Sequence, residues 1–194
     1  MLDRSQTDRA RSGVADRVAA VTALAADRAA EAEAARRLTP DVVDALVEAG
    51  FARHFVPAGF GGSEGSFAEA ATAVADVGEG CAASAWCASL MANLPRFAAY
   101  LPLEGQQEIW QDGPDVVVVG SPSPFGRASS TPGGWLVSGT WPYISGVDYA
   151  RWVLVCAAAP DAGTVTTPRF FAVPIADCRV VDTWSNVGML ATGS

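Results

Sequence analysis

Apolar residues in the first half of the chain recur at every third or fourth position, which is the period of a helix with one buried face. The longest such stretch covers residues 3–38, where Val14, Val18, Val21 and Leu24 share one side of the expected helix. The rest of this stretch is rich in Ala, Arg, Asp and Glu, as expected for a solvated face.

A second helix is expected to begin at Thr39, with Thr39 as the capping residue, Pro40 in the first helical position and Asp41 in the first turn. Gly50 is expected to end it. Its buried face should consist of Val42, Val43, Leu46 and Val47. The same signals predict further helices, the first of them capped by Ser66, over 66–77, 82–99 and 103–111.

The pattern changes after Gly113 and Pro114, where short runs rich in β-branched residues alternate with Gly, Pro and Ser turns. We expect strands at 115–120, 135–140, 151–157, 169–173 and 178–182. Helices first and strands second favour an α+β fold over alternating β-α units. We therefore predict a helical domain over 1–113 and a β-domain over 114–194.

The chain of 194 residues carries a net charge of −8 and has arginine but no lysine among its thirteen basic residues. An acidic chain is repelled by phosphate backbones and anionic lipid, so we expect no nucleic-acid and no membrane partner. The lack of lysine excludes Schiff-base chemistry and a Walker-type phosphate loop.

The thiols and the single histidine, His54, give no metal-binding pattern. No C-x-x-C pair occurs, so no metal site is expected. The residues around Cys81 and Cys87 are apolar, which favours buried free thiols at these two positions. The first residues lack the apolar core of a signal peptide, and together these features predict a cytoplasmic location. The cysteines are Cys81, Cys87, Cys156 and Cys178.

The segment Gly133–Gly146 stands out from its surroundings. A Gly-Gly turn opens a strand of alternating apolar and small polar residues, which ends in Trp141, Tyr143 and the pair Ser145-Gly146. A small polar pair flanked by aromatic rings suits the edge of a flat aromatic cofactor. From the residue pattern alone, the pair is more typical of an ordinary Ser-Gly turn between strands. Trp141 is equally suited to flanking a cofactor ring and to packing in the core.

Several separated segments, taken in order, resemble the acyl-CoA dehydrogenase superfamily. The nearest branch is that of the reduced-flavin-dependent, two-component monooxygenases. Leu190 departs from the pattern, since the family usually has arginine there. The matching segments are Leu38–Phe51, Val56–Gly62, Ser84–Trp86, Gly120–Pro122, Gly126–Ala128, Trp141–Gly146 and Asp182–Ser194.

The resemblance implies an N-terminal helical domain, an antiparallel β-domain and, beyond Ser194, further strands and a C-terminal helical bundle. We therefore expect a truncated or split member with an incomplete β-domain. The implied function is the oxygenase component of a two-component monooxygenase that acts on an aromatic or other small organic substrate. The implied cofactor is FMN or FAD, supplied in reduced form by a flavin reductase.

The resemblance also assigns site residues. Ser145, as the catalytic residue, would place a hydrogen-bond donor near flavin N5 or O4, with Gly146 beside it. Ser121 and Ser123 would bind the pyrimidine edge, although a Pro-rich turn is the alternative. Trp141 would flank the flavin ring. Trp86 would line the substrate pocket, although core packing is the favoured alternative for it.

Two other functions remain open at this stage. One is an acyl-CoA dehydrogenase with tightly bound FAD, and the other is a non-catalytic fragment or partner subunit. Without the implied bundle, we expect weak or absent flavin binding by the chain alone, and either self-association or a partner that supplies the missing helices. The apolar residues expected at that surface are Val42, Leu46, Trp86, Leu90 and the strand around Val153.

Two features that suggest catalysis are interpreted as structural. His54 lies between apolar neighbours on a connecting segment, which argues against a general base. The loop Gly59–Gly65 precedes a helix as a phosphate-binding loop does. It lacks the preceding strand of a dinucleotide site, and Asp76, at the spacing of the acidic residue, falls inside a predicted helix.

Overall fold

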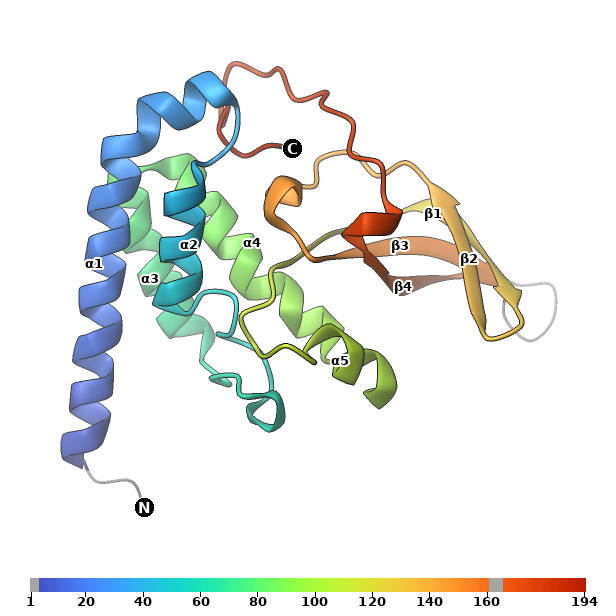
Figure 1. Cartoon of the computed structure of the whole chain (residues 1–194), viewed down its shortest axis with the longest axis horizontal. Coiled ribbons are helices and arrows are strands. Elements are labelled where there is room, and N and C mark those ends of the chain that lie inside the picture. Colours follow the sequence, from blue (N-terminus) through green and yellow to red (C-terminus); the bar gives the residue numbers. More distant parts are fainter. Residues whose placement is uncertain (1–3, 161–165) are drawn as a thin grey trace.

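The computed structural model describes residues 4–160 and 166–194, with side chains described from residue 17 onward in these ranges. The helices come first and gather on one side, and a twisted sheet follows on the other (Figure 1). The helices are α1 (Arg4–Ala35), α2 (Pro40–Ala49), α3 (Phe67–Gly80), α4 (Ala82–Ala98) and α5 (Leu103–Ile109).

The helix boundaries follow local signals. The Ser66 hydroxyl accepts the Glu69 N–H and the Glu69 carboxylate accepts the Ser66 N–H, a capping box that starts α3. At the start of α2, Thr39 has the extended conformation of a cap, but its hydroxyl makes no capping bond. The carboxylate of Asp41 accepts the Val42 N–H instead, at 3.0 Å. The left-handed Gly50 ends α2 as predicted.

The strands form one mixed sheet in the order β2-β1-β3-β4. Strand β1 pairs antiparallel with β2, and β3 pairs antiparallel with β4, but β1 and β3 are parallel. The prediction of an antiparallel β-domain is therefore wrong for the central pair, β1 and β3. β1 and β3 are parallel because the connection after β2 brings the chain back to the end of the sheet where β1 begins, so β3 starts beside the start of β1. The strands are β1 (Val118–Thr131), β2 (Gly134–Gly139), β3 (Trp152–Pro160) and β4 (Thr166–Pro174).

The strand expected at 178–182 does not form. Strand β4 is followed by the short 3-10 helix η3 (Ile175–Asp177), and the chain then leaves the sheet. It crosses to the end of α1 (Figure 1). There the carboxylate of Asp182 accepts hydrogen bonds from the guanidinium of Arg36. This ion pair draws the segment away from the sheet edge where a strand would pair.

Helices and sheet share one core. It includes Ala88 and Met91 from α4, and Val119 and Val153 from β1 and β3, all buried. Val42, Leu46 and Val153 thus face the chain's own interior, which corrects their expected place on a partner surface. The change from helices to strands lies between Ile109 and Val118, and the two-domain division at Gly113 stays a prediction.

The buried thiol of Cys87 on α4 predicts a loss of stability at high pH. Burial raises its pKa from 9.0 to about 12, because the thiolate is poorly solvated inside the core. This contribution to the unfolding free energy is complete below about pH 9, the unfolded value, and is lost as the pH rises toward 12. Urea midpoints should therefore fall across this range.

The variant Cys87→Ala should flatten that pH dependence, whereas Cys81→Ala, at the start of the same helix, controls for the loss of a thiol. An unchanged slope in Cys87→Ala would contradict the assignment. Burial also raises the pKa of Tyr149, which acts in the same direction, so part of the slope should persist.

Candidate functional site

The pair Ser145-Gly146 lies directly before the 3-10 helix η2 (Val147–Tyr149), between β2 and β3. Gly146 has φ +77°, a left-handed conformation that favours glycine. Ser145 is only 6% exposed, and its hydroxyl oxygen accepts the indole N–H of Trp86 at 3.0 Å. Two residues that the sequence singled out separately, 59 positions apart, are therefore in contact.

The last residues of the chain complete this cluster. The carbonyl of Thr192 accepts the Gly146 N–H at 2.9 Å. The hydroxyl of Ser194 lies 2.5 Å from that of Ser145 and 2.9 Å from that of Thr192. No role was predicted for Thr192 or Ser194, although both lie in a segment that resembles the family. Their hydroxyl groups, in a segment that resembles the family, were the signal in the sequence that could have identified Thr192 and Ser194 as site residues.

Trp86 is 45% exposed, so the core packing favoured for it is wrong. Tyr143, two positions before Ser145, is 74% exposed with φ +62°, and its ring meets that of Trp184 edge-on at 6.1 Å. Aromatic surface thus lies exposed close to the buried hydroxyl of Ser145. This arrangement suits a flat aromatic ligand with a polar edge.

Trp141 is held differently. Its indole N–H donates to the Cys156 carbonyl on β3 at 2.8 Å. Its ring rests on Gly126 and Gly139, where any β-carbon would overlap with it. The geometry favours the core alternative for Trp141, and its contact with a flavin stays a prediction.

Ser121 and Ser123 both lie on β1. Ser121 is buried and pairs in register with Val155, and it points to the same face of the strand as Val119. The side chain of Val119 packs next to Gly146, which places this part of β1 near the Ser145 cluster. Ser123 falls within the register shift of β1 and is half-buried. Their binding roles remain predictions.

His54 and the loop Gly59–Gly65 have structural roles. A ring nitrogen of His54 lies 2.9 Å from the carbonyl oxygen of Ser66, at the start of α3. The carboxylate of Glu64 in this loop accepts the N–H of Ala58, the residue before the loop, at 2.9 Å. Because this carboxylate is negatively charged and already accepts a backbone N–H, it disfavours a phosphate bound at the loop.

Two arginines at the end of α1 hold the C-terminal segment in place. The guanidinium of Arg36 makes two 2.8 Å bonds to the Asp182 carboxylate and one of 2.5 Å to the Trp184 carbonyl. Arg37 bonds to Asp148 at 3.0 Å, and its backbone pairs with that of Thr192. These contacts fix the segment that brings Thr192 to Gly146.

Arg36→Ala should loosen this segment at little cost to global stability. The ion pair is half exposed, so we expect a loss of about 0.5–1 kcal/mol. Tryptic cleavage at Arg179 should accelerate, because the released segment opens locally. Arg28→Ala is the control, since Arg28 pairs with Asp41, away from this segment. Equal cleavage rates in the two variants would contradict the anchoring role.

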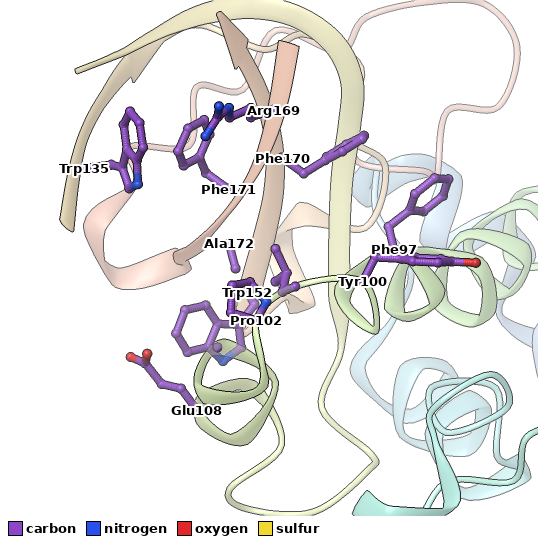
Figure 2. A pocket seen from close by; sticks show the side chains of 12 residues that line it. Phe97, Tyr100, Pro102, Glu108, Trp135, Trp152, Arg169, Phe170, Phe171 and Ala172 are labelled. Carbon is purple, nitrogen blue, oxygen red and sulfur yellow. The ribbon is translucent and has the colours of Figure 1, made fainter. Parts of the chain in front are cut away.

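A separate cavity of about 780 Å³ lies between α4, α5 and β4. Figure 2 shows the aromatic side chains that make up half of its lining, which the sequence did not predict. The ring of Phe97 lies 5.5 Å from that of Phe170, and the guanidinium of Arg169 lies 5.8 Å from the ring of Trp135. An apolar hollow beside the edge strand β4 is typical of a surface that another polypeptide covers.

Neither a metal centre nor a membrane-spanning helix is found in the part of the chain that the structure describes. Within that part, no three His, Cys, Asp or Glu side chains come together as metal ligands. Its helices also lack any stretch both long and apolar enough to cross a bilayer.

The order of helices and strands defines a protein with an acyl-CoA dehydrogenase-like fold. Residues 8–108 match the family model of the acyl-CoA dehydrogenase N-terminal domain, which is just over half of the chain. The chain belongs to this family, as the resemblance of its segments predicted.

Its curated relatives include oxygenase components. It is 36% identical, over 92% of its length, to the FADH(2)-dependent resorcinol hydroxylase oxygenase component of Rhizobium sp. (strain MTP-10005), covering 44% of that protein. It is 31% identical, over 87% of its length, to the p-hydroxyphenylacetate 3-hydroxylase oxygenase component of Acinetobacter baumannii, covering 40% of it. The chain thus spans less than half the length of these relatives.

Solved structures agree in fold. The 3-HSA hydroxylase from Rhodococcus sp. RHA1 superposes with a TM-score of 0.88 at 30% identity, covering 93% of this chain and 48% of that one. XiaF from Streptomyces sp., solved in complex with FADH2 and glycerol, gives 0.89 at 29% identity, covering 98% of this chain and 48% of that one.

Proposed function

We propose that this chain forms the flavin-facing part of the oxygenase component of a two-component monooxygenase. The contact of Trp86 with Ser145 carries the proposal, because it joins two family-like segments into one polar site beside exposed aromatic rings. The relatives named above as oxygenase components support it. An aromatic or other small organic substrate and a separate flavin reductase belong to the proposal, and the cytoplasmic location stays a prediction.

The residues present fit a reduced FMN or FAD. The hydroxyl of Ser145 and the backbone around Gly146 provide the polar contacts, and Trp86 and Tyr143 provide aromatic surface. Ser121 and Ser123 on β1 would bind the polar edge of the ring, and Trp86 would face the substrate. When bound, the reduced flavin supplies the electrons that activate dioxygen. This chain's part is to orient the ring and limit access of water.

An anaerobic titration tests flavin binding. The chain is mixed with dithionite-reduced FMN or FAD, and binding is followed by ligand-observed NMR, which detects weak complexes. We expect reduced flavin to bind with a dissociation constant above about 1 µM, equivalent to about −8 kcal/mol. Submicromolar binding by the chain alone would contradict the expectation of an incomplete flavin site, and absence of binding up to millimolar flavin would show that these residues do not hold the ring by themselves. Tight retention of oxidised FAD would favour the acyl-CoA dehydrogenase alternative.

The cavity beside β4 supports a further part of the proposal, that a polypeptide equivalent to the remaining half of the relatives covers this face. The relatives are more than twice as long as the matched region, so they contain enough chain to do so. Tyr100, which lines the cavity, is exposed, as are Leu103 at the start of α5 and Trp86 elsewhere on α4. A long apolar surface of this kind costs solubility unless it is covered.

Sedimentation of the purified chain across a concentration series tests this exposure. We expect self-association that weakens in Tyr100→Ser/Leu103→Ser, because the variant removes two exposed apolar groups without touching the core. The control is Leu136→Ser, an equally exposed apolar residue on β2. A monomer at every concentration would contradict the exposed interface.

A further inference from the structure

The half-buried arginines of this chain differ in their partners. In the part of the chain that the structure describes there are four, and Arg96 in the last turn of α4 is one of them. Each of the others donates a hydrogen bond to an aspartate carboxylate, whereas no carboxylate among the described residues bonds to Arg96. A half-buried cation without a counter-charge is unusual, because the cost of removing it from water is then not offset. The other three are Arg28, Arg36 and Arg53.

Two phenyl rings stand where a carboxylate is expected. The Cζ atom of Arg96 lies 4.7 Å from the ring centre of Phe97 and 5.2 Å from that of Phe67, the first residue of α3. Both distances are within the range of a cation–π attraction, which offsets part of the desolvation cost. The rings attract the charge, but they do not satisfy the N–H groups that point outward in the plane of the guanidinium.

The hydrogen-bond donors of Arg96 are therefore unused. Its Nε atom is enclosed by the protein without a partner, and among the described residues none accepts a bond from its two terminal nitrogens. Only Nε is enclosed, so the terminal nitrogens are the pair that a ligand can reach. Two parallel N–H groups of a guanidinium match the two oxygens of a carboxylate in spacing and in charge.

The surroundings add apolar surface to this charge. Phe67 is 58% exposed, and its ring centre lies 4.7 Å from that of Phe55. Phe97 also lines the cavity beside β4, where its ring lies 5.5 Å from that of Phe170. An exposed phenyl ring next to an unpaired guanidinium suits a ligand that joins a carboxylate to an apolar group.

We propose that Arg96, Phe67 and Phe97 form a binding site for a carboxylate attached to an apolar group. The terminal nitrogens of Arg96 bind the carboxylate oxygens, and the phenyl rings contact the apolar group. The site lies ten residues along α4 from Trp86, which is about 15 Å in a helix. It is therefore separate from the Ser145 cluster, and the inference does not depend on flavin binding.

One carboxylate chemistry has two sources here. A free small molecule is the first. The second is an acidic side chain of a neighbouring copy, since the chain carries 21 acidic residues against 13 basic ones. In both cases the same guanidinium nitrogens bind the same group.

Titration of the full chain with sodium benzoate tests the site. Benzamide is the neutral analogue of nearly the same shape, the ionic strength is held constant, and ligand-observed NMR detects weak complexes. We expect benzoate to bind in the millimolar range and about tenfold more tightly than benzamide, because only benzoate makes a charge-assisted pair with Arg96. Equal binding of the two compounds to wild type would overturn the proposal.

Variants locate the binding. Arg96→Met keeps an unbranched stem and removes the charge, so benzoate should bind about tenfold more weakly than to wild type. Arg96→Lys keeps the charge without the paired N–H groups and should give an intermediate affinity. Arg127→Met, a change at an exposed arginine on β1, is the control and should bind as wild type does. Unchanged benzoate affinity in Arg96→Met, with a melt showing that it is folded, would overturn the role of Arg96.

Sedimentation with and without benzoate distinguishes the two sources. If a neighbouring copy supplies the carboxylate, benzoate and Arg96→Met should both weaken the self-association expected for this chain. If the ligand is a free small molecule, benzoate should bind without changing the sedimentation. Equal weakening by benzamide would attribute the effect to apolar contact alone and would overturn the carboxylate site.

Discussion

Gly126→Ala should destabilise the protein by about 3 kcal/mol, at the upper end of the cost of overpacking. The β-carbon would overlap with the ring of Trp141, which rests on Gly126 and Gly139. The ring has little freedom to move aside, because its N–H is bonded to the Cys156 carbonyl at 2.8 Å. Relief of the overlap therefore requires loss of that bond or a shift of β1.

The measurement is the urea midpoint of the variant relative to wild type, with the slope of the transition checked for two-state behaviour. Gly134→Ala on β2 is the matched control. A β-carbon there meets open space, so its stability should equal that of wild type or rise slightly. Equal midpoints for the two variants would show that Trp141 is not held in this position.

Ser145→Ala should weaken the binding of reduced flavin by a factor of ten or more. The variant removes the hydroxyl that the proposed function places against the polar edge of the ring, and loss of one partner of a buried hydrogen bond costs about 1–3 kcal/mol. The fold should persist, because alanine fits the space of serine and Trp86 is exposed enough for water to take its N–H.

Reduced-flavin affinity in Ser145→Ala is to be compared with that of Ser129→Ala, a change at an exposed serine on β1, with thermal melts of both. Unaltered affinity in a folded Ser145→Ala variant would remove Ser145 from the site.

The sequence determined the local elements. The three- and four-residue spacing of Val18 and Val21 predicts α1, and the Ser66 signal predicts α3. Such signals work because helix periodicity and capping depend on residues only a few positions apart. The turn at Ser145-Gly146 was also predicted locally, from a glycine that adopts the left-handed conformation. The family was predicted from the order of short matching segments along the chain.

Tertiary structure alone decided how these elements meet. The parallel pairing of β1 with β3 depends on the path of the connection after β2, which no local pattern encodes. Trp86 looked like a core residue because its helix is rich in alanine. It is exposed because the face of α4 on which it lies turns toward Ser145 rather than into the core.

The candidate site shows the same division. Ser145 was found from its own segment, but its partners Thr192 and Ser194 come from 47 and 49 positions away. They arrive there because Arg36 and Arg37 bind Asp182 and Asp148 across the fold. Contacts of this kind depend on packing and charge summed over the whole chain, so the partners of the Ser145 hydroxyl could be determined only from the folded structure.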